Sequence, residues 1–155
     1  MTPCVKLLKK SKIVYRVHKY EHDDACTSYG EEAAQKLGVE HNRVFKTLVI
    51  VSESTEFIVA IVPVSAKLGL KAAAKAVGAK KTAMADAKDV EKVTGYILGG
   101  VSPLGQKRRL KTLIDSSANG YETIFVSAGK RGLEAELSPK DLQELLDAKF
   151  EEIAI

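Results

Sequence analysis

Apolar and polar residues alternate in several short segments of the chain, and these segments are rich in β-branched side chains. A two-residue period is typical of strands, whose side chains point alternately to opposite faces. Glycine, proline and short polar stretches separate the segments, as expected at turns. We therefore expect strands over Ile13–Tyr20, Val44–Val51, Phe57–Val62, Leu110–Ile114, Thr123–Val126 and Leu133–Leu137.

Other segments have a helical period together with residues that start and stop helices. Thr2 and Ser138 each precede a proline, which is the order expected of a helix cap followed by the first helical residue. Asp86 is a further candidate cap, and glycine follows three of the segments, as it does at many helix ends. The expected helices are Pro3–Lys10, Glu31–Leu37 before Gly38, Lys71–Val77 before Gly78, Asp86–Val93 before Gly95, and a last helix from Pro139 onward.

The order of these elements indicates a mixed α/β protein. Ser52–Thr55 is expected to turn one strand back on the next as a hairpin, and Leu133–Leu137 is a hairpin partner for the strand before it. No shift in composition marks a linker, and no internal repeat is visible. Because 155 residues are the size of one ordinary domain with its own core, we expect a single domain over residues 1–155.

Composition narrows the class of protein further. Hydrophobic residues make up 45% of the chain and charged residues 28%, which is typical of a folded globular protein. Tryptophan is absent and aromatic residues account for 6%, so the core must be built from Val, Ile, Leu and Ala. A net charge of +4 and a pI of about 9.0 suit a weakly bound polyanion, but from charge alone a lysine-rich solvated surface is the better interpretation.

Targeting signals, disulfides and metal sites leave no trace in the sequence. The N-terminal segment has no apolar core of the signal-peptide type and no stretch approaches a membrane span, so we expect a cytoplasmic protein with no membrane partner. Cys4 and Cys26 are too few for a disulfide framework. His18, His22 and His41 lack zinc-site spacing, and His18, inside an expected strand, is interpreted as structural. We expect no metal, no cofactor and no DNA partner.

The most unusual segment is Gly99–Gly105, where three glycines and a proline exclude a regular helix or strand. Glycine lets the backbone approach a ligand closely, so N–H groups exposed here can hold a phosphate or an oxyanion. The segment has neither the Walker pattern nor the dinucleotide-binding pattern. Taken alone, it is more simply interpreted as a structural turn.

Lys46 interrupts an otherwise apolar expected strand. Phe45 and Lys46 should point to opposite faces, with Lys46 on the face of Val44 and Leu48. Such a lysine either extends its ammonium group past a sheet edge to water or stands in a cleft. Without other information, the first of these is favoured.

Basic residues follow the glycine-rich segment directly, at Lys107, Arg108 and Arg109. A cluster of this kind is usually only solvated, but beside a candidate anion site it can bind nucleic-acid phosphates. The chain has no nucleophile elbow, no evident Ser-His-Asp arrangement and no cysteine with activating neighbours. A hydrolase built on this sequence therefore needs an attacking group from elsewhere.

The chain contains, in this order, the motifs Tyr20, Phe45–Leu48, Gly95–Tyr96, Gly99–Gly105 and Ser127–Glu134. Together they resemble the YbaK (EbsC-like) family, and the resemblance covers nearly the whole chain. Its members are Cys-tRNA(Pro) deacylases related to the editing domain inserted in bacterial prolyl-tRNA synthetases. The resemblance implies a mixed, barrel-like β-sheet flanked by helices, a mischarged aminoacyl-tRNA as substrate, and a complex with prolyl-tRNA synthetase. One departure is Ala128, where close relatives have glycine.

The resemblance also implies the residues of the site. Lys46 corresponds to the functional lysine of the family and faces a G-x-x-x-P loop, here Gly99 to Pro103, which contacts the aminoacyl group or the terminal adenosine. A catalytic role is therefore expected for Lys46, Gly99, Gly100 and Val101. The substrate-binding residues expected are Tyr20, Thr47, Ser102, Pro103, Ser127, Gly129 and Glu136, and the tRNA-binding residues are Lys107, Arg108 and Arg109.

An aminoacyl ester is already activated, so modest stabilisation of its tetrahedral intermediate suffices. We expect N–H groups of the glycine-rich loop to stabilise the oxyanion, and the Lys46 ammonium group to hold the carbonyl oxygen or the terminal phosphate. The resemblance suggests that the cysteine thiol of the substrate attacks its own carbonyl and leaves as a cyclic thiolactone; a positioned water is the alternative. Other interpretations are activity on Cys-tRNA(Cys) or on another small amino acid such as alanine, a module that binds aminoacyl-tRNA or a nucleotide without hydrolysis, and a lysine Schiff-base enzyme.

Overall fold

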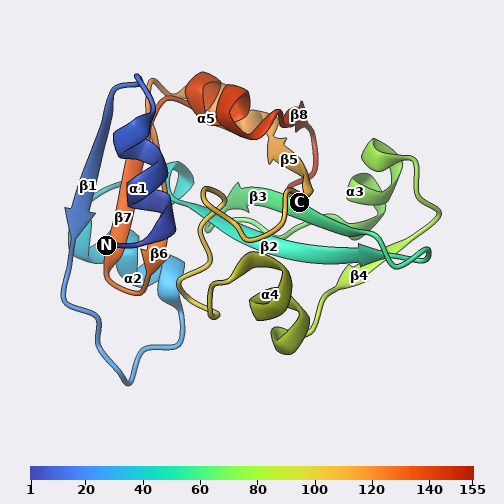
Figure 1. The fold of residues 1–155 in the computed structure, drawn as a ribbon, viewed down its shortest axis with the longest axis horizontal. Coiled ribbons are helices and arrows are strands. Elements are labelled where there is room, and N and C mark those ends of the chain that lie inside the picture. Colours follow the sequence, from blue (N-terminus) through green and yellow to red (C-terminus); the bar gives the residue numbers. More distant parts are fainter.

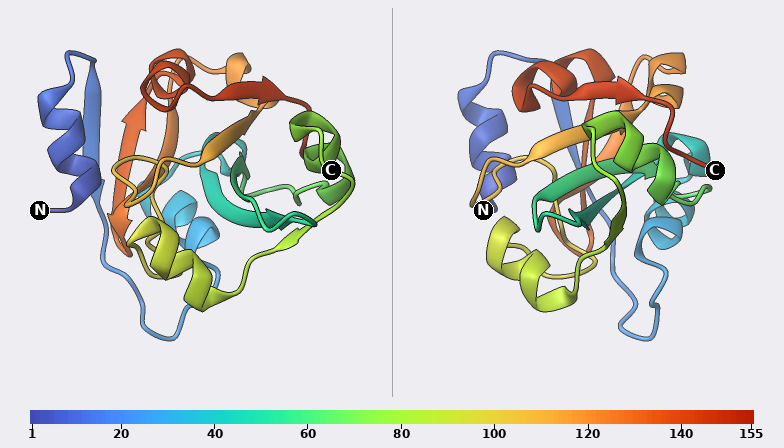
Figure 2. Two further views of the ribbon diagram at one scale, coloured as in Figure 1. Left: turned by 45° about the vertical axis from the view of Figure 1, so that its right-hand side comes forward. Right: turned by 90° about the vertical axis from the view of Figure 1, so that its right-hand side faces the viewer.

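The computed structural model describes residues 1–155, which form two β-sheets with helices packed around them (Figure 1). The three-stranded sheet has the order β1-β7-β6, and the five-stranded sheet has the order β4-β2-β3-β5-β8. The mixed α/β class expected from the sequence is confirmed. The description as barrel-like holds only loosely, because two separate sheets with free edges do not close into a barrel (Figure 2).

The three-stranded sheet joins the two ends of the chain. Strand β1 (Tyr15–Lys19) pairs antiparallel with β7 (Leu133–Leu137), which forms a hairpin with β6 (Ile124–Lys130). The register places His18 opposite Glu134. The hairpin predicted for this part of the chain is therefore confirmed.

The five-stranded sheet is built around a second predicted hairpin, β2 (Phe45–Ser52) and β3 (Phe57–Pro63). Strands β5 (Lys111–Asp115) and β8 (Lys149–Glu151) continue the sheet beyond β3 in parallel. Strand β4 (Thr82–Met84) pairs only with the end of β2, so the first half of β2 has no sheet neighbour on that side. Neither β4 nor β8 was predicted from the sequence.

The helices begin where the sequence predicts caps. The side chains of Thr2, Asp86 and Ser138 each accept a hydrogen bond from the N–H group three residues further on. The helix from Tyr29 starts two residues before its predicted start at Glu31. No helix is long and apolar enough to cross a membrane. The helices are α1 (Pro3–Lys10), α2 (Tyr29–Leu37), α3 (Leu70–Val77), α4 (Ala87–Thr94) and α5 (Pro139–Leu146), with short 3₁₀ helices η1 (His41–Arg43) and η2 (Ser116–Gly120).

Valine, isoleucine, leucine and alanine make up most of the core, as the composition predicted. The largest cluster lies between the two sheets and includes residues of α1 and α5, and the Phe45 ring of β2 packs in it. A smaller cluster joins Ala33 and Ala34 of α2 to Val44 and Phe125. This second cluster holds α2 beside the start of β2, and so fixes one wall of the site described next.

Candidate active site

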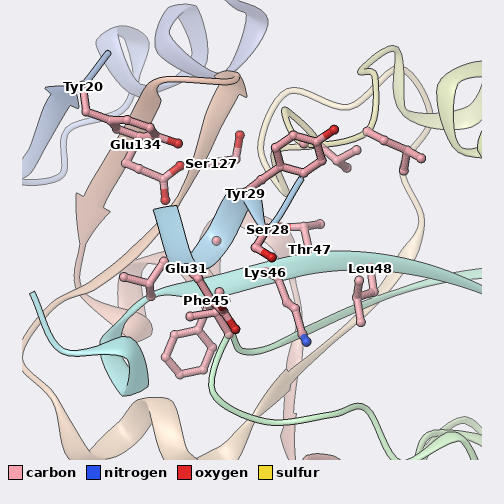
Figure 3. A pocket seen from close by; sticks show the side chains of 16 residues that line it. Tyr20, Ser28, Tyr29, Glu31, Phe45, Lys46, Thr47, Leu48, Ser127 and Glu134 are labelled. Atoms are coloured by element: carbon pink, nitrogen blue, oxygen red, sulfur yellow. The ribbon is translucent and has the colours of Figure 1, made fainter. Parts of the chain in front are cut away.

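A cleft of about 390 Å³ opens where the first half of β2 runs beside α2, the glycine-rich loop and the β6–β7 hairpin. Its walls come from segments far apart in the sequence, and the fold brings their side chains together (Figure 3). The predicted site residues that line the cleft are Tyr20, Lys46, Thr47, Gly99, Val101 and Ser127.

Strand β2 gives the cleft both a cation and a free backbone edge. Phe45 is 2% exposed in the core, and the half-buried Lys46 points the other way, as the strand period predicted. Val44 makes an isolated bridge to β6, and β4 pairs with β2 only from Ile50 onward. Between these two points β2 has no neighbouring strand on that side, and its residues 45–48 line the cleft. The Thr47 hydroxyl is buried without a hydrogen-bond partner, which leaves a polar group of the cleft wall unused by the protein.

Lys46 therefore stands in a cleft rather than at a solvated sheet edge. Burial is the largest influence on its ammonium group and lowers its pKa. The carboxylate of Glu31, which also lines the cleft, acts in the opposite direction, and the nearby charge of Lys67 lowers the pKa further. The cation is thus held in a partly desolvated place, where its interaction with a developing negative charge is stronger than in water.

The glycine-rich loop is packed so tightly that its first two glycines have no room for a side chain. A Cβ atom on Gly99 would lie 2.6 Å from Nε of Arg131 and 2.9 Å from the ring of Tyr29, and Gly99 has a φ of 86°. A Cβ atom on Gly100 would lie 2.7 Å from Cα of Lys130. The loop backbone is therefore held against the β6–β7 turn, with Gly99 on the cleft side.

Only some N–H groups of this loop are free of a partner within the protein. The Gly100 N–H donates to the Ile97 carbonyl at 3.0 Å, so it is already used, whereas those of Gly99 and Val101 donate to no group of the protein. Ser102 is fully buried and its hydroxyl accepts a hydrogen bond from Leu104. Gly100, Ser102 and Pro103 do not line the cleft, and their expected roles stay predictions.

Two further predicted residues lie outside the cleft. Gly129 packs against the first residues of the chain and the ring of Tyr96, where a Cβ atom would lie 2.9 Å from Cε1. Glu136 forms an ion pair with His18 at 2.8 Å and accepts a hydrogen bond from Thr123 at 2.6 Å. Glu134, two residues before Glu136 on β7, lines the cleft instead of Glu136.

Comparison with known protein families decides the identity of the fold. The family model described as the aminoacyl-tRNA editing domain matches residues 22–145, a range that contains nearly every wall of the cleft. The chain belongs to this family. It is 40% identical over 152 residues to an Enterococcus faecalis protein named "Putative Cys-tRNA(Pro)/Cys-tRNA(Cys) deacylase EbsC", a match that covers 98% of this chain and 92% of the relative.

Further similarities agree with this assignment. The editing domain is 31% identical over 119 residues to the uncharacterised protein YwhH of Bacillus subtilis, covering 77% of this chain and 75% of the relative. A crystal structure described as "a putative trans-editing enzyme for prolyl tRNA synthetase" superposes with a TM-score of 0.81 at 28% identity, over 91% of this chain and 87% of that one. The hypothetical protein APE2540, at a TM-score of 0.89 and 22% identity over 99% of both chains, supports the fold alone.

Arg131 connects two walls of the cleft in this editing domain, although it does not line the cleft itself. Its Nε and Nη2 atoms donate to the Leu98 carbonyl at 3.1 and 2.8 Å, and its guanidinium carbon lies 4.4 Å from the centre of the Tyr29 ring. The β6–β7 turn is thus tied both to α2 and to the glycine-rich loop. Neither Arg131 nor Tyr29 was expected from the sequence to be a site residue, because only the tertiary contacts bring them together.

Burial leaves Glu134 with a strongly perturbed carboxyl group and raises its pKa to about 8. A folded-state pKa above the unfolded one means that the folded protein binds this proton more tightly, so stability falls as the pH rises from about 4.5 to about 8. We expect Glu134→Gln to remove this dependence, so that the melting temperature of the wild type falls relative to the variant between pH 5 and pH 9. Thermal melts of both proteins across that range measure the difference; a constant difference would contradict the assignment.

The basic residues Lys107, Arg108 and Arg109 are exposed and lie outside the cleft. The Lys107 and Arg108 N–H groups donate to carbonyls at the end of α4, which fixes the segment directly after the glycine-rich loop. No group of three or more His, Cys, Asp or Glu side chains is placed to hold a metal ion.

Neutralising all three of these basic residues is expected to weaken tRNA binding and to flatten its salt dependence, because each phosphate contact releases counterions. Dissociation constants measured at several salt concentrations give the slope. The matched control replaces Lys6, Lys9 and Lys10, three exposed cations of α1. An equal effect of both triple variants would mean that only net charge matters.

Proposed function

We propose that this editing domain is a free-standing deacylase that hydrolyses mischarged Cys-tRNA(Pro), with Cys-tRNA(Cys) as a second substrate. Family membership and the 40% identity to the Enterococcus faecalis relative support a deacylase. The observation that carries the proposal is that Lys46, Gly99 and Val101 line one cleft, and that the N–H groups of Gly99 and Val101 donate to no group of the protein. These are the groups needed to stabilise an oxyanion.

Neither the two cysteines nor Ser127 of the protein suits the role of nucleophile. Cys4 is fully buried, and burial raises the pKa of its thiol to about 11, so the reactive thiolate is scarce. Cys26 does not line the cleft. The Ser127 hydroxyl does line it, but it accepts a hydrogen bond from the Gly129 N–H, and no histidine lines the cleft to act as its base.

We assign the attacking group to the substrate, as the family resemblance suggests. The cysteine thiol sulfur forms a bond to the ester carbonyl carbon, the carbon–oxygen ester bond breaks, and the thiol proton ends on the ribose oxygen of the released tRNA. The other product is the cyclic thiolactone, which water opens to cysteine. Lys46 and the loop N–H groups lower the barrier by binding the carbonyl oxygen as it becomes negative.

This chemistry accounts for selectivity that pocket size alone does not provide. A proline-sized pocket in a synthetase discriminates poorly against cysteine, because small differences in apolar bulk give only about 10- to 200-fold preference. A second site that requires a thiol removes cysteine and spares the correct amino acid. The partner we assign is prolyl-tRNA synthetase in the cytoplasm, which would supply the contacts to the tRNA body that a chain of 155 residues has little surface to make.

The test is a deacylation panel with Cys-, Ala-, Ser- and Pro-tRNA and with 2-aminobutyryl-tRNA, which is similar in size to cysteine but has no thiol. We expect loss of cysteine alone. Equal hydrolysis of the 2-aminobutyryl ester would assign the attack to water, and preferential hydrolysis of alanine would change the substrate. Binding of Cys-tRNA(Pro) without hydrolysis would reduce the protein to a binding module.

A further inference from the structure

The lining of the cleft includes a carboxyl group that the protein itself leaves without a partner. Glu134 is 6% exposed, lines the cleft, and forms no hydrogen bond or ion pair with any other group of the chain. Figure 3 shows it beside Tyr20 and Ser127, whereas the ammonium group of Lys46 points away from this group of residues.

The other buried acids show that this lack of partners is specific to Glu134. Glu32 binds His22 at 2.6 Å and the Asp23 N–H at 2.8 Å. Asp115 accepts hydrogen bonds from three backbone N–H groups. Because a buried ionisable group without a partner is costly, the fold normally supplies one, and at Glu134 it does not.

The surroundings of Glu134 supply no positive charge. The titratable groups whose charges interact with it are the Tyr20 phenol and the Cys4 thiol, and both are acids. His18 is opposite Glu134 in the strand register, but its ring nitrogen is engaged by Glu136. Burial raises the pKa of Glu134 to about 8. A cation that enters the cleft would therefore be the first positively charged partner to favour its carboxylate form.

The substrate class carries such a cation. An aminoacyl ester has an α-ammonium group on the carbon next to its carbonyl, so a site that binds both groups needs an acceptor in the cleft that Gly99 and Val101 line, and Glu134 lines that cleft. On the basis of the proposed function, we propose that Glu134 binds the α-amino group of the aminoacyl ester and thereby restricts the enzyme to esters with a free amino group. Peptidyl-tRNA and other N-acylated tRNAs, which have no such cation, are then spared.

The experiment compares the wild type with Glu134→Gln on Cys-tRNA(Pro) and on N-acetyl-Cys-tRNA(Pro), which retains the thiol and the ester but has no cation. A hydrogen bond to a charged group is typically worth about 1.5–3 kcal/mol, or about 10- to 100-fold. We expect the wild type to prefer the free-amino substrate by that factor in kcat/KM. The variant should lose activity on this substrate by a similar factor, and its activity on the N-acetyl substrate should not fall.

Glu144→Gln, which removes one exposed negative charge on α5, is the matched control, and thermal melting verifies folding. Unchanged activity of Glu134→Gln on Cys-tRNA(Pro) would overturn the proposal. An equal loss on both substrates would also overturn it, because Glu134 would then act on the thiol or the ester. A wild type that deacylates no aminoacyl-tRNA would instead contradict the proposed function itself, which separates the two failures.

Discussion

Lys46→Ala is expected to reduce turnover of Cys-tRNA(Pro) by about 10²-fold or more, the usual cost of losing one oxyanion-stabilising group. The loss should appear in kcat, because the charge on the carbonyl oxygen develops during the reaction. The fold should survive, because Lys46 is half-buried at the cleft and does not belong to any apolar cluster of the core. The assay is release of cysteine from Cys-tRNA(Pro), with thermal melting as the folding control.

Two further variants make this prediction specific. Lys46→Arg keeps the charge but changes its reach and geometry, so at most partial activity is expected. Lys67→Ala removes an exposed positive charge that influences Lys46 but does not line the cleft, and its effect should be small. Near-normal turnover by a folded Lys46→Ala protein would make Lys46 a structural residue and remove the catalytic assignment.

Local patterns were sufficient to predict most elements of the fold. Caps and glycine stops predicted the ends of the helices to within a few residues. The two-residue period of β2 correctly placed Phe45 in the core and Lys46 on the opposite face. Strands β4 and β8 escaped prediction for a physical reason. Each is three residues long, too short for a period, and exists because it pairs with a strand that was already in place.

The sequence could not show that Glu134, and not Glu136, lines the cleft. Both lie on the same face of β7, because they are two residues apart, so alternation cannot distinguish them. Their contacts with the rest of the protein distinguish them. Glu136 contacts His18, Thr123 and Arg43, whereas Glu134 lines the cleft. Those neighbours come from distant parts of the chain.

The catalytic assignment rested on resemblance rather than on any single motif. By itself the glycine-rich segment was best interpreted as a turn and Lys46 as a solvated lysine. The structure supplies a reason to join them, because Lys46 and Gly99 line one cleft. It also divides the loop, since Gly99 and Val101 keep free N–H groups while the N–H of Gly100 is used within the protein.

Gly99→Ala is the second variant expected to have a large effect, a loss of turnover of about 10²-fold or more. A φ of 86° disfavours any residue with a Cβ atom by about 1–2 kcal/mol, and the new methyl group would meet Nε of Arg131 at 2.6 Å. Relief of that contact requires the loop or the Arg131 side chain to move. The N–H groups of Gly99 and Val101 would then leave the position in which they can bind the oxyanion.

Gly120→Ala is the matched control, because a Cβ atom there has no other atom within 4 Å. It should retain wild-type turnover and melting temperature. Gly99→Ala should lose kcat more than it raises KM, since its N–H groups act on charge that is present only in the transition state. Steady-state kinetics on Cys-tRNA(Pro) separate the two constants. A folded Gly99→Ala protein with normal kcat would show that the loop contributes shape to the cleft but no stabilisation of the oxyanion.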